Sequence, residues 1–204
     1  MALQLVKAVP ESGATRDLLI RGAEQQIAAK GLEGLTFRNL AETLGIRVHT
    51  IYAYFSSPED LLSGVAAQYG IALAELFADD GLRDPASVLL EGAGALVRHF
   101  AENPAHLRLE LRDFETPGGV SALSIKRYRM PMEWTCRLAS LDSILTRGRS
   151  AGSLRAVDAV DCYRAIVGVA MMHPRDPGHV LETAALVRDV IERYVCRELE
   201  DIQP

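Results

Sequence analysis

Two short amphipathic segments joined by a glycine-containing turn lie between residues 36 and 55. The first repeats apolar residues at i, i+3, i+4 and i+7 (Phe37, Leu40, Ala41 and Leu44), and the second does so at Val48, Ile51, Tyr52 and Phe55. This spacing puts each apolar set on one face of a helix. Thr36 is a favoured N-cap residue and Gly45 a favoured helix terminator, so both ends of the first segment are marked. The pattern predicts a helix-turn-helix.

The remaining chain also follows the helical period and has no strand-like alternation. Apolar residues make up 49% of the 204 residues and aromatic residues only 6%, which favours helices rich in Ala and Leu. Breakers at 116–119, at the turn 148–153 and around Pro174 separate the predicted helices, and Pro131 is expected to interrupt or kink one of them. The predicted helices cover 15–30, 58–77, 85–100, 104–114, 120–147, 157–172 and 178–198. We therefore predict an all-α fold.

The organisation that we predict has a loose arm at 1–14, a helix-turn-helix domain at 15–62 and a larger helical domain at 63–204. The first residues lack the long apolar run of a secretory signal, and no segment approaches the ~20 apolar residues of a membrane span. The three cysteines, Cys136, Cys162 and Cys196, form no C-x-x-C pair, which is typical of reduced thiols. We expect a cytoplasmic protein.

Net charge does not identify a partner. The chain carries −5 overall, and residues 1–62 hold six basic against seven acidic residues, a balance of −1. Any contact with DNA must therefore come from how charges are placed on one face. If Val48, Ile51 and Phe55 are buried, the second short helix exposes residues that can meet base edges, thymine methyl groups and phosphates: Arg47, His49, Thr50, Ala53 and Tyr54.

The stretch from Arg16 to Leu62 resembles the TetR family of bacterial transcriptional regulators. The resemblance lies in the G-x-x-x-x-T spacing from Gly31 to Thr36 and in the sequence GLEGLTFRNLAETLGIRVHTIYAYFSSPEDLL, with its LA-x-x-LG, I-Y-x-Y-F and E-D-L-L elements. The rest of the chain matches the family in layout alone. This resemblance implies a DNA-binding domain followed by a domain that dimerises and encloses a ligand.

The resemblance also implies roles for individual residues. Thr36 would contact a phosphate, Tyr52 and Tyr54 would reach the DNA backbone, and the start of the third helix would read bases. Two departures bear on this. Arg47 stands where the family often has a capping Ser or Thr, and Pro58 where it usually has Lys, which removes one phosphate contact. The expected DNA-binding residues are Thr36, Arg38, Arg47, Val48, His49, Thr50, Tyr52 and Tyr54.

For the C-terminal domain, the family implies a homodimer that reads a palindromic operator and releases it, as a repressor would, when a small, largely apolar effector binds. The apolar stripes of the last two helices indicate the dimer interface: Tyr163, Ile166, Val167, Ala184, Val187, Ile191 and Tyr194. Glu110 lies on the apolar face of its helix, so we expect it in the pocket or paired with an arginine. The candidate pocket residues are Phe100, Glu110, Leu111, Phe114, Tyr128, Met132, Trp134 and Met171, with His99 and His106 as weaker polar candidates.

Three alternatives remain beside the regulator. An enzyme is not expected, because no catalytic motif or acid–base pair stands out; we expect no cofactor. A metal site of His173, Asp176 and His179 would lie in a proline-rich loop without helical ligand spacing, so none is expected either. A helical interaction or small-molecule-binding protein that has lost DNA binding is supported by Pro58 and by the uncapped third helix. A monomeric bundle is the alternative to the dimer.

Overall fold

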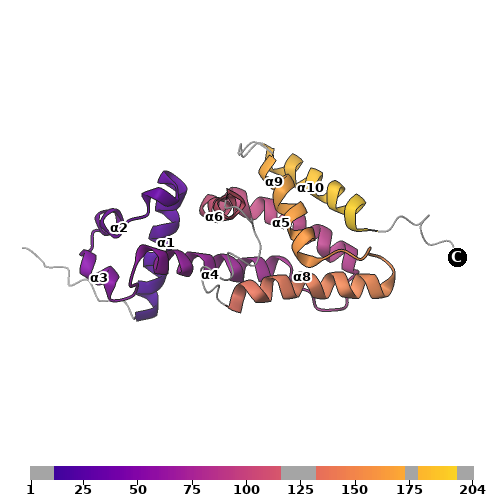
Figure 1. The fold of residues 1–204 in the computed structure, drawn as a ribbon, viewed down its shortest axis with the longest axis horizontal. Helices are drawn as coiled ribbons and strands as arrows, with labels where there is room; N and C mark the ends of the chain where they lie inside the picture. Colours follow the sequence, from indigo (N-terminus) through magenta and orange to yellow (C-terminus); the bar gives the residue numbers. More distant parts are fainter. Residues whose placement is uncertain (1–11, 116–131, 173–178, 197–204) are drawn as a thin grey trace, which may run out of the picture. The chain divides into compact units, whose positions relative to one another are not determined.

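The computed structural model describes residues 12–115, 132–172 and 179–196, with no account of side chains at 12, 112–115, 132–137 and 172. Within those ranges it contains helices (Figure 1) and one isolated β-bridge, between Leu154 and Cys196. The predicted all-α fold is confirmed. The helices are α1 (Ser12–Lys30), the 3₁₀ turn η1 (Leu32–Gly34), α2 (Phe37–Leu44), α3 (Val48–Tyr52), α4 (Pro58–Leu76), α5 (Pro85–Glu102), α6 (Pro104–Glu115), α8 (Met132–Ala151), α9 (Ala159–Met172) and α10 (Val180–Val195).

The chain divides into two compact units, Met1–Val65 and Ala66–Pro204. The boundary falls inside α4, so this helix contributes residues to both units. In the part of the chain that the structure describes, no helix is both long enough and apolar enough to cross a membrane.

In the N-terminal unit, α1 packs against α2, and α2 packs against α3. The contact between α1 and α2 depends on Gly22, because a Cβ atom there would lie 2.8 Å from a methyl group of Leu40 and 3.1 Å from one of Leu44. Leu40 is fully buried, so it has little freedom to move aside. The missing side chain thus lets α2 sit close to α1.

The C-terminal unit is built around α5, which packs against α8 and α10, while α10 also packs against α9. The buried residues of these helices form one apolar cluster, as expected for a single core. Its fully buried members include Leu73, Leu89, Leu96, Ile144, Leu154, Ile166, Val187 and Ile191. Cys162 is buried in the same cluster, where burial raises the pKa of its thiol to about 12 and so keeps it protonated and inert.

Several predicted boundaries are wrong by a few residues. α1 begins at Ser12, so residues 12–14 do not belong to a loose arm. α3 ends at Tyr52, before Phe55. α8 continues to Ala151 through the predicted turn, because Gly148 lies against Leu154 inside the helix and the left-handed residue that ends it is Gly152, with φ of 79°. The helix predicted at 120–147 lies partly, and the kink at Pro131 wholly, outside the described residues.

Candidate nucleic-acid interface

The helix-turn-helix has well-defined ends. Thr36 is the N-cap of α2, and its Oγ1 accepts a hydrogen bond of 3.2 Å from the backbone N–H of Asn39, which confirms the predicted cap. Gly45 ends the helix in the left-handed conformation, with φ of 64°. Arg47 occupies the N-cap position of α3 without a side-chain capping bond, as its chemistry requires. The turn between the helices is therefore set by Gly45 and not by a cap.

Burial separates the two faces of α3 and the turn after it. Ile51 and Phe55 are buried, and the guanidinium of Arg16 lies 5.1 Å from the centre of the Phe55 ring. Val48 is 37% exposed, so its predicted burial is wrong: it stands at the first position of α3, one turn before the buried Ile51. Its exposure is compatible with its other predicted role, a contact with DNA.

The polar candidates lie on the open side of this unit. Arg38, Arg47 and His49 are exposed, and Thr50 and Tyr54 are half-buried. Tyr52 is 59% exposed, and its ring meets the edge of Phe37 with the centroids 5.0 Å apart. That contact between α3 and α2 holds the phenol in place while leaving its hydroxyl available. The arrangement can present hydrogen-bond donors to a groove and its phosphates.

Acidic side chains lie near these donors. Arg38 and Glu42 form an exposed ion pair of 3.4 Å along α2. At the start of α4, the backbone N–H of Asp60 donates to Oγ of Ser57, and Oδ2 of Asp60 accepts from the backbone N–H of Ser56. The end of α4 that lacks a lysine at Pro58 therefore also carries a fixed carboxylate. A phosphate placed at this end of α4 would meet a negative charge.

A hydrogen-bond relay behind α2 was not predicted. Nε2 of Gln26, a buried residue of α1, donates to Oγ1 of Thr43 over 3.2 Å, and Thr43 donates to the carbonyl oxygen of Asn39. The side chain of Asn39 donates in turn to the carbonyl oxygen of Gly34. The available signal was that Gln26 falls seven residues after Leu19, on the apolar face of its helix. The relay ties α2 to α1 and to η1.

Comparison with known proteins identifies this domain. Residues 19–65 match the model of the family described as bacterial regulatory proteins, tetR family. These residues form a domain of the tetR family. It is 36% identical over 67 residues to the HTH-type transcriptional repressor AcnR of Corynebacterium diphtheriae, a match that spans 33% of this chain and 35% of that repressor. The family is one of regulators and not of enzymes.

Solved structures extend the likeness in fold to nearly the whole chain. The TetR family transcriptional regulator PfmR from Thermus thermophilus is 25% identical, with 91% of this chain and 97% of that one covered and a TM-score of 0.63. A tetR-family regulatory protein from Rhodococcus RHA1 is 20% identical, with 93% and 100% covered and a TM-score of 0.69. The ketosteroid transcriptional regulator KstR2 of Mycobacterium tuberculosis is 16% identical, with 94% and 100% covered and a TM-score of 0.63.

The pocket candidates of the C-terminal unit are only partly described. Phe100 is buried in the core, and Leu111 and Met171 are half-buried at its edge. The side chains of Phe114, Tyr128, Met132 and Trp134 lie outside the described residues. Glu110 is 1% exposed, and the hydroxyl of Tyr163 donates a hydrogen bond to its Oε1. One partner of Glu110 is thus a tyrosine of α9.

Glu110 belongs to a polar network inside the C-terminal unit. The hydroxyl groups of Tyr69 and Tyr163 are 3.0 Å apart, and the ring of Tyr69 packs on those of His99 and His106. Nε2 of His99 and Nδ1 of His106 are 2.8 Å apart and share a hydrogen bond. The network connects α4, α5, α6 and α9 in an otherwise apolar core. No group of three or more metal-ligating side chains occurs in the described ranges, which leave out His173 and Asp176.

Most of the predicted dimer interface is wrong. Tyr163, Ile166, Val167, Ala184, Val187 and Ile191 are buried in the core of their own protomer, where α9 and α10 pack against each other and α10 packs against α5. Residues in such positions cannot form a surface for a second copy. Of the predicted set, Tyr194 alone is exposed, at 44%. Helical spacing identified an apolar stripe, and the protomer itself covers it.

Proposed function

We propose that this tetR-family protein is a transcriptional repressor that binds a palindromic operator as a homodimer and releases it when a small molecule binds. The observation that carries the proposal is the helix-turn-helix of α2 and α3, with Ile51 and Phe55 buried and Arg47, His49 and Tyr52 directed to the open side. A protein of this kind acts in the cytoplasm, where bacterial DNA lies. Residues 19–65, which match the family model, include this whole motif.

The expected binding mode follows from the shape of the motif. α3 would enter the major groove, with Arg47, Val48 and His49 at its first turn near base edges. α2 would cross the sugar–phosphate backbone with its N-terminus toward a phosphate, where the free N–H groups and the hydroxyl of Thr36 can donate. Tyr52 and Tyr54 would contact the same backbone. In this arrangement Arg47 and His49 carry specificity, and Thr36 and Tyr52 carry affinity.

A homodimer gives such a motif its palindromic target, because a two-fold protein reads two half-sites about 34–36 Å apart. The exposed side of α10 is the surface that we propose for the dimer. It carries Leu186, at 39% exposure, with Tyr194 further along the same face and Val190 half-buried between them. Large exposed apolar side chains on one helix are typical of association surfaces.

The effector that we propose is mainly apolar and carries at least one hydrogen-bonding group. The support is the network of Tyr69, Glu110 and Tyr163, which adds a carboxylate and two hydroxyl groups to a core lined by Phe100 and Leu107. Buried polar groups discriminate strongly between ligands that satisfy them and ligands that do not. Because α4 contributes to both units, a ligand that changes the packing of Tyr69 can alter DNA binding through this helix.

The first test is selection of duplexes from a random DNA pool, followed by binding anisotropy at two salt concentrations. The proposal expects an inverted repeat and an affinity that falls steeply with salt. Arg47→Gln should weaken binding by about tenfold or more, since a bidentate arginine–guanine contact contributes about 1–3 kcal/mol. Arg164→Gln, which removes a partly exposed arginine of α9 outside the helix-turn-helix, is the control and should bind as the parent does.

The same assay separates the regulator from its alternative. If the selection recovers no duplex although light scattering confirms a dimer, the fold has lost DNA binding. The carboxylates near Pro58 and the uncapped α3 would then account for that loss. Pro58→Lys should in that case restore salt-dependent binding. His49→Ala should relax the preference at one position of each half-site, and an unchanged motif would remove His49 from base recognition.

A further inference from the structure

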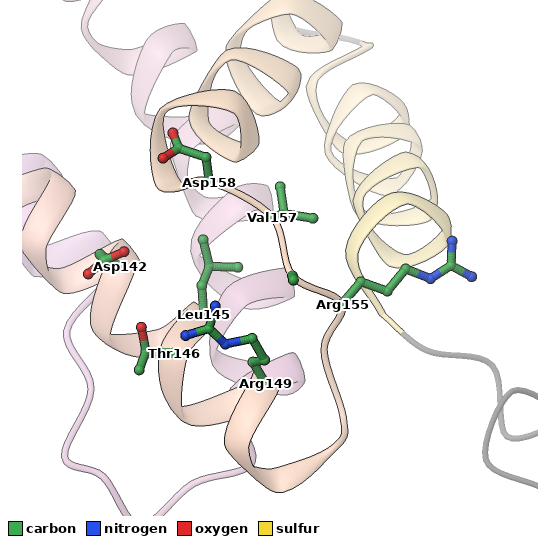
Figure 2. A pocket seen from close by; sticks show the side chains of 8 residues that line it. Asp142, Leu145, Thr146, Arg149, Arg155, Val157 and Asp158 are labelled. Carbon is green, nitrogen blue, oxygen red and sulfur yellow. The ribbon is translucent and has the colours of Figure 1, made fainter. Parts of the chain in front are cut away.

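A hollow of about 270 Å³ lies in the C-terminal unit, away from the tyrosine and histidine network, between the second half of α8 and the segment that leads into α9 (Figure 2). No part of the proposed function uses it. Its lining comes from two stretches of chain, one face of α8 and the residues from 155 to 158: Asp142, Leu145, Thr146, Arg149, Arg155, Ala156, Val157 and Asp158.

The walls of the hollow are held by backbone hydrogen bonds. After Gly152 ends α8, the N–H groups of Ser153 and Leu154 both donate to the carbonyl oxygen of Gly148, at 3.0 and 3.1 Å. Leu154 is fully buried, and the N–H of Arg155 donates to the carbonyl oxygen of Val195 over 2.7 Å. The site is thus formed in the free protein, which lowers the entropy cost of binding a ligand there.

Opposite charges line this hollow without neutralising each other. Asp142 and Arg149 lie two turns apart on one face of α8, and in the part of the chain that the structure describes neither side chain makes an ion pair or a hydrogen bond. By contrast, Arg147, two residues before Arg149, binds both carboxylate oxygens of Asp79. A half-buried arginine on α8 thus pairs with a carboxylate, whereas the exposed Arg149 forms no ion pair among the described residues.

The directions of the side chains define what could bind. In Figure 2 the guanidinium of Arg149 lies beside Leu145 and Thr146, inside the hollow, whereas that of Arg155 points away past α10. Asp158 caps the start of α9, where one of its oxygens accepts from the backbone N–H of Val160 over 2.8 Å. The hollow therefore offers one cation with Asp142 and Asp158 at its sides, over an apolar floor of Leu145 and Val157.

We propose that this hollow binds a small zwitterion with an aliphatic side chain, of the amino-acid type. Its carboxylate would pair with Arg149, its ammonium group would lie between Asp142 and Asp158, and its aliphatic part would cover Leu145 and Val157. A simple anion would meet the two aspartates, and a simple cation would meet the arginine, so each gains one attraction and suffers a repulsion. A ligand that carries both charges satisfies every group in the lining.

The test is calorimetric titration of the free full-length protein with L-leucine, which does not require DNA. Two analogues are matched to it, 4-methylpentanoate without the amino group and 3-methylbutylamine without the carboxylate. We expect leucine to bind at one site with a dissociation constant on the order of 1 mM, and each analogue to bind about tenfold more weakly or less. Arg149→Gln and Asp142→Asn should each weaken leucine binding by a similar factor, with unchanged melting temperatures.

The control variant is again Arg164→Gln, which removes a partly exposed arginine outside the hollow and should bind leucine as the parent does. Equal binding of leucine and its analogues, or equal binding of leucine by the parent and Arg149→Gln, would overturn the proposal. The absence of any heat of binding at 20 mM leucine would do the same, because this concentration is about twentyfold above the expected dissociation constant. The proposed leucine site requires no contact with DNA. A failure to bind leucine therefore does not contradict the proposed regulator, and a DNA selection without product does not contradict this site.

Discussion

The two units of this chain place their polar side chains differently. In the N-terminal unit, the candidate residues Arg47, His49 and Tyr52 are exposed, and the described core beneath them is apolar except for Thr15 and Gln26. In the C-terminal unit, the polar side chains of Tyr163 and Glu110 are buried within the core itself. An exposed set can meet a large partner such as a duplex. A buried set can meet only a molecule small enough to enter, or serve the stability of the fold.

This difference changes what a substitution does. On the exposed face of the N-terminal unit, a side chain can be removed with little loss of stability, so binding and folding can be measured separately. In the polar network of the C-terminal unit, each group is both a structural partner and a candidate ligand contact. Substitutions there need a stability measurement beside every binding measurement.

The largest expected effect tests whether the two units unfold separately. Phe55→Ala removes a buried ring and its contact with Arg16, which should lower the free energy of unfolding of the N-terminal unit by about 3–5 kcal/mol. Urea unfolding followed by amide hydrogen exchange measures each unit. Leu96→Ala, in the core of α5, is the reciprocal variant and should act on the C-terminal unit. Equal loss of protection in both units for either variant would make the chain one cooperative body.

The next effect concerns the buried polar network. Tyr163→Phe removes the hydroxyl that donates to Glu110 and faces Tyr69, which should reduce stability by about 1–3 kcal/mol and leave DNA affinity unchanged without effector. Tyr194→Phe removes the same group from an exposed position and should change stability by less than about 0.5 kcal/mol. Thermal unfolding compares the two. If both variants lose the same stability, the buried hydroxyl of Tyr163 contributes no more than the exposed one of Tyr194.

A smaller effect compares one cap from each unit. Thr36→Ala and Asp84→Ala each remove the side-chain cap of a helix and should cost about 1 kcal/mol of stability, but only Thr36→Ala should weaken binding of DNA. The hydrogen bond from the backbone N–H of Ser87 lowers the pKa of Asp84 from its ordinary value of 3.8. The contribution of ionised Asp84 to the free energy of unfolding is therefore present above pH 3.8 and is lost as the pH falls through the lowered pKa. Unfolding should be measured at neutral and at acidic pH, and the difference in free energy of unfolding between the parent and Asp84→Ala should be smaller in acid. A difference of the same size at both pH values would contradict an ionised cap.

The smallest effect lies in the exposed pair on α2. Glu42→Gln should change stability by less than about 1 kcal/mol, because ion pairs in water contribute little. Without Glu42, the charge of Arg38 is available to phosphates, so DNA affinity should rise by a few fold at low salt and less at high salt. Anisotropy at two salt concentrations measures this. A gain that is independent of salt would point to a different cause.

Sequence patterns predicted local features better than contacts between distant helices. The cap at Thr36, the end of α2 at Gly45 and the all-α fold depend on neighbouring residues, and all three are confirmed. The dimer interface was mispredicted because spacing reveals that Val187 and Ile191 share an apolar face, but not that α5 and α9 of the same protomer cover that face. The hydrogen bond between Tyr163 and Glu110 joins residues that are 53 positions apart, so no local sequence pattern could predict it.

The absent side chain at Gly22 carries an evolutionary consequence. A substitution there would touch neither DNA nor any polar group, yet the leucines of α2 would have to give way to the added carbon. Since α2 packs directly on α3, the displacement would move the proposed reading surface as a whole. Substitution at this one interior position is thus a way for related proteins to change operator affinity while every residue of the reading surface stays the same.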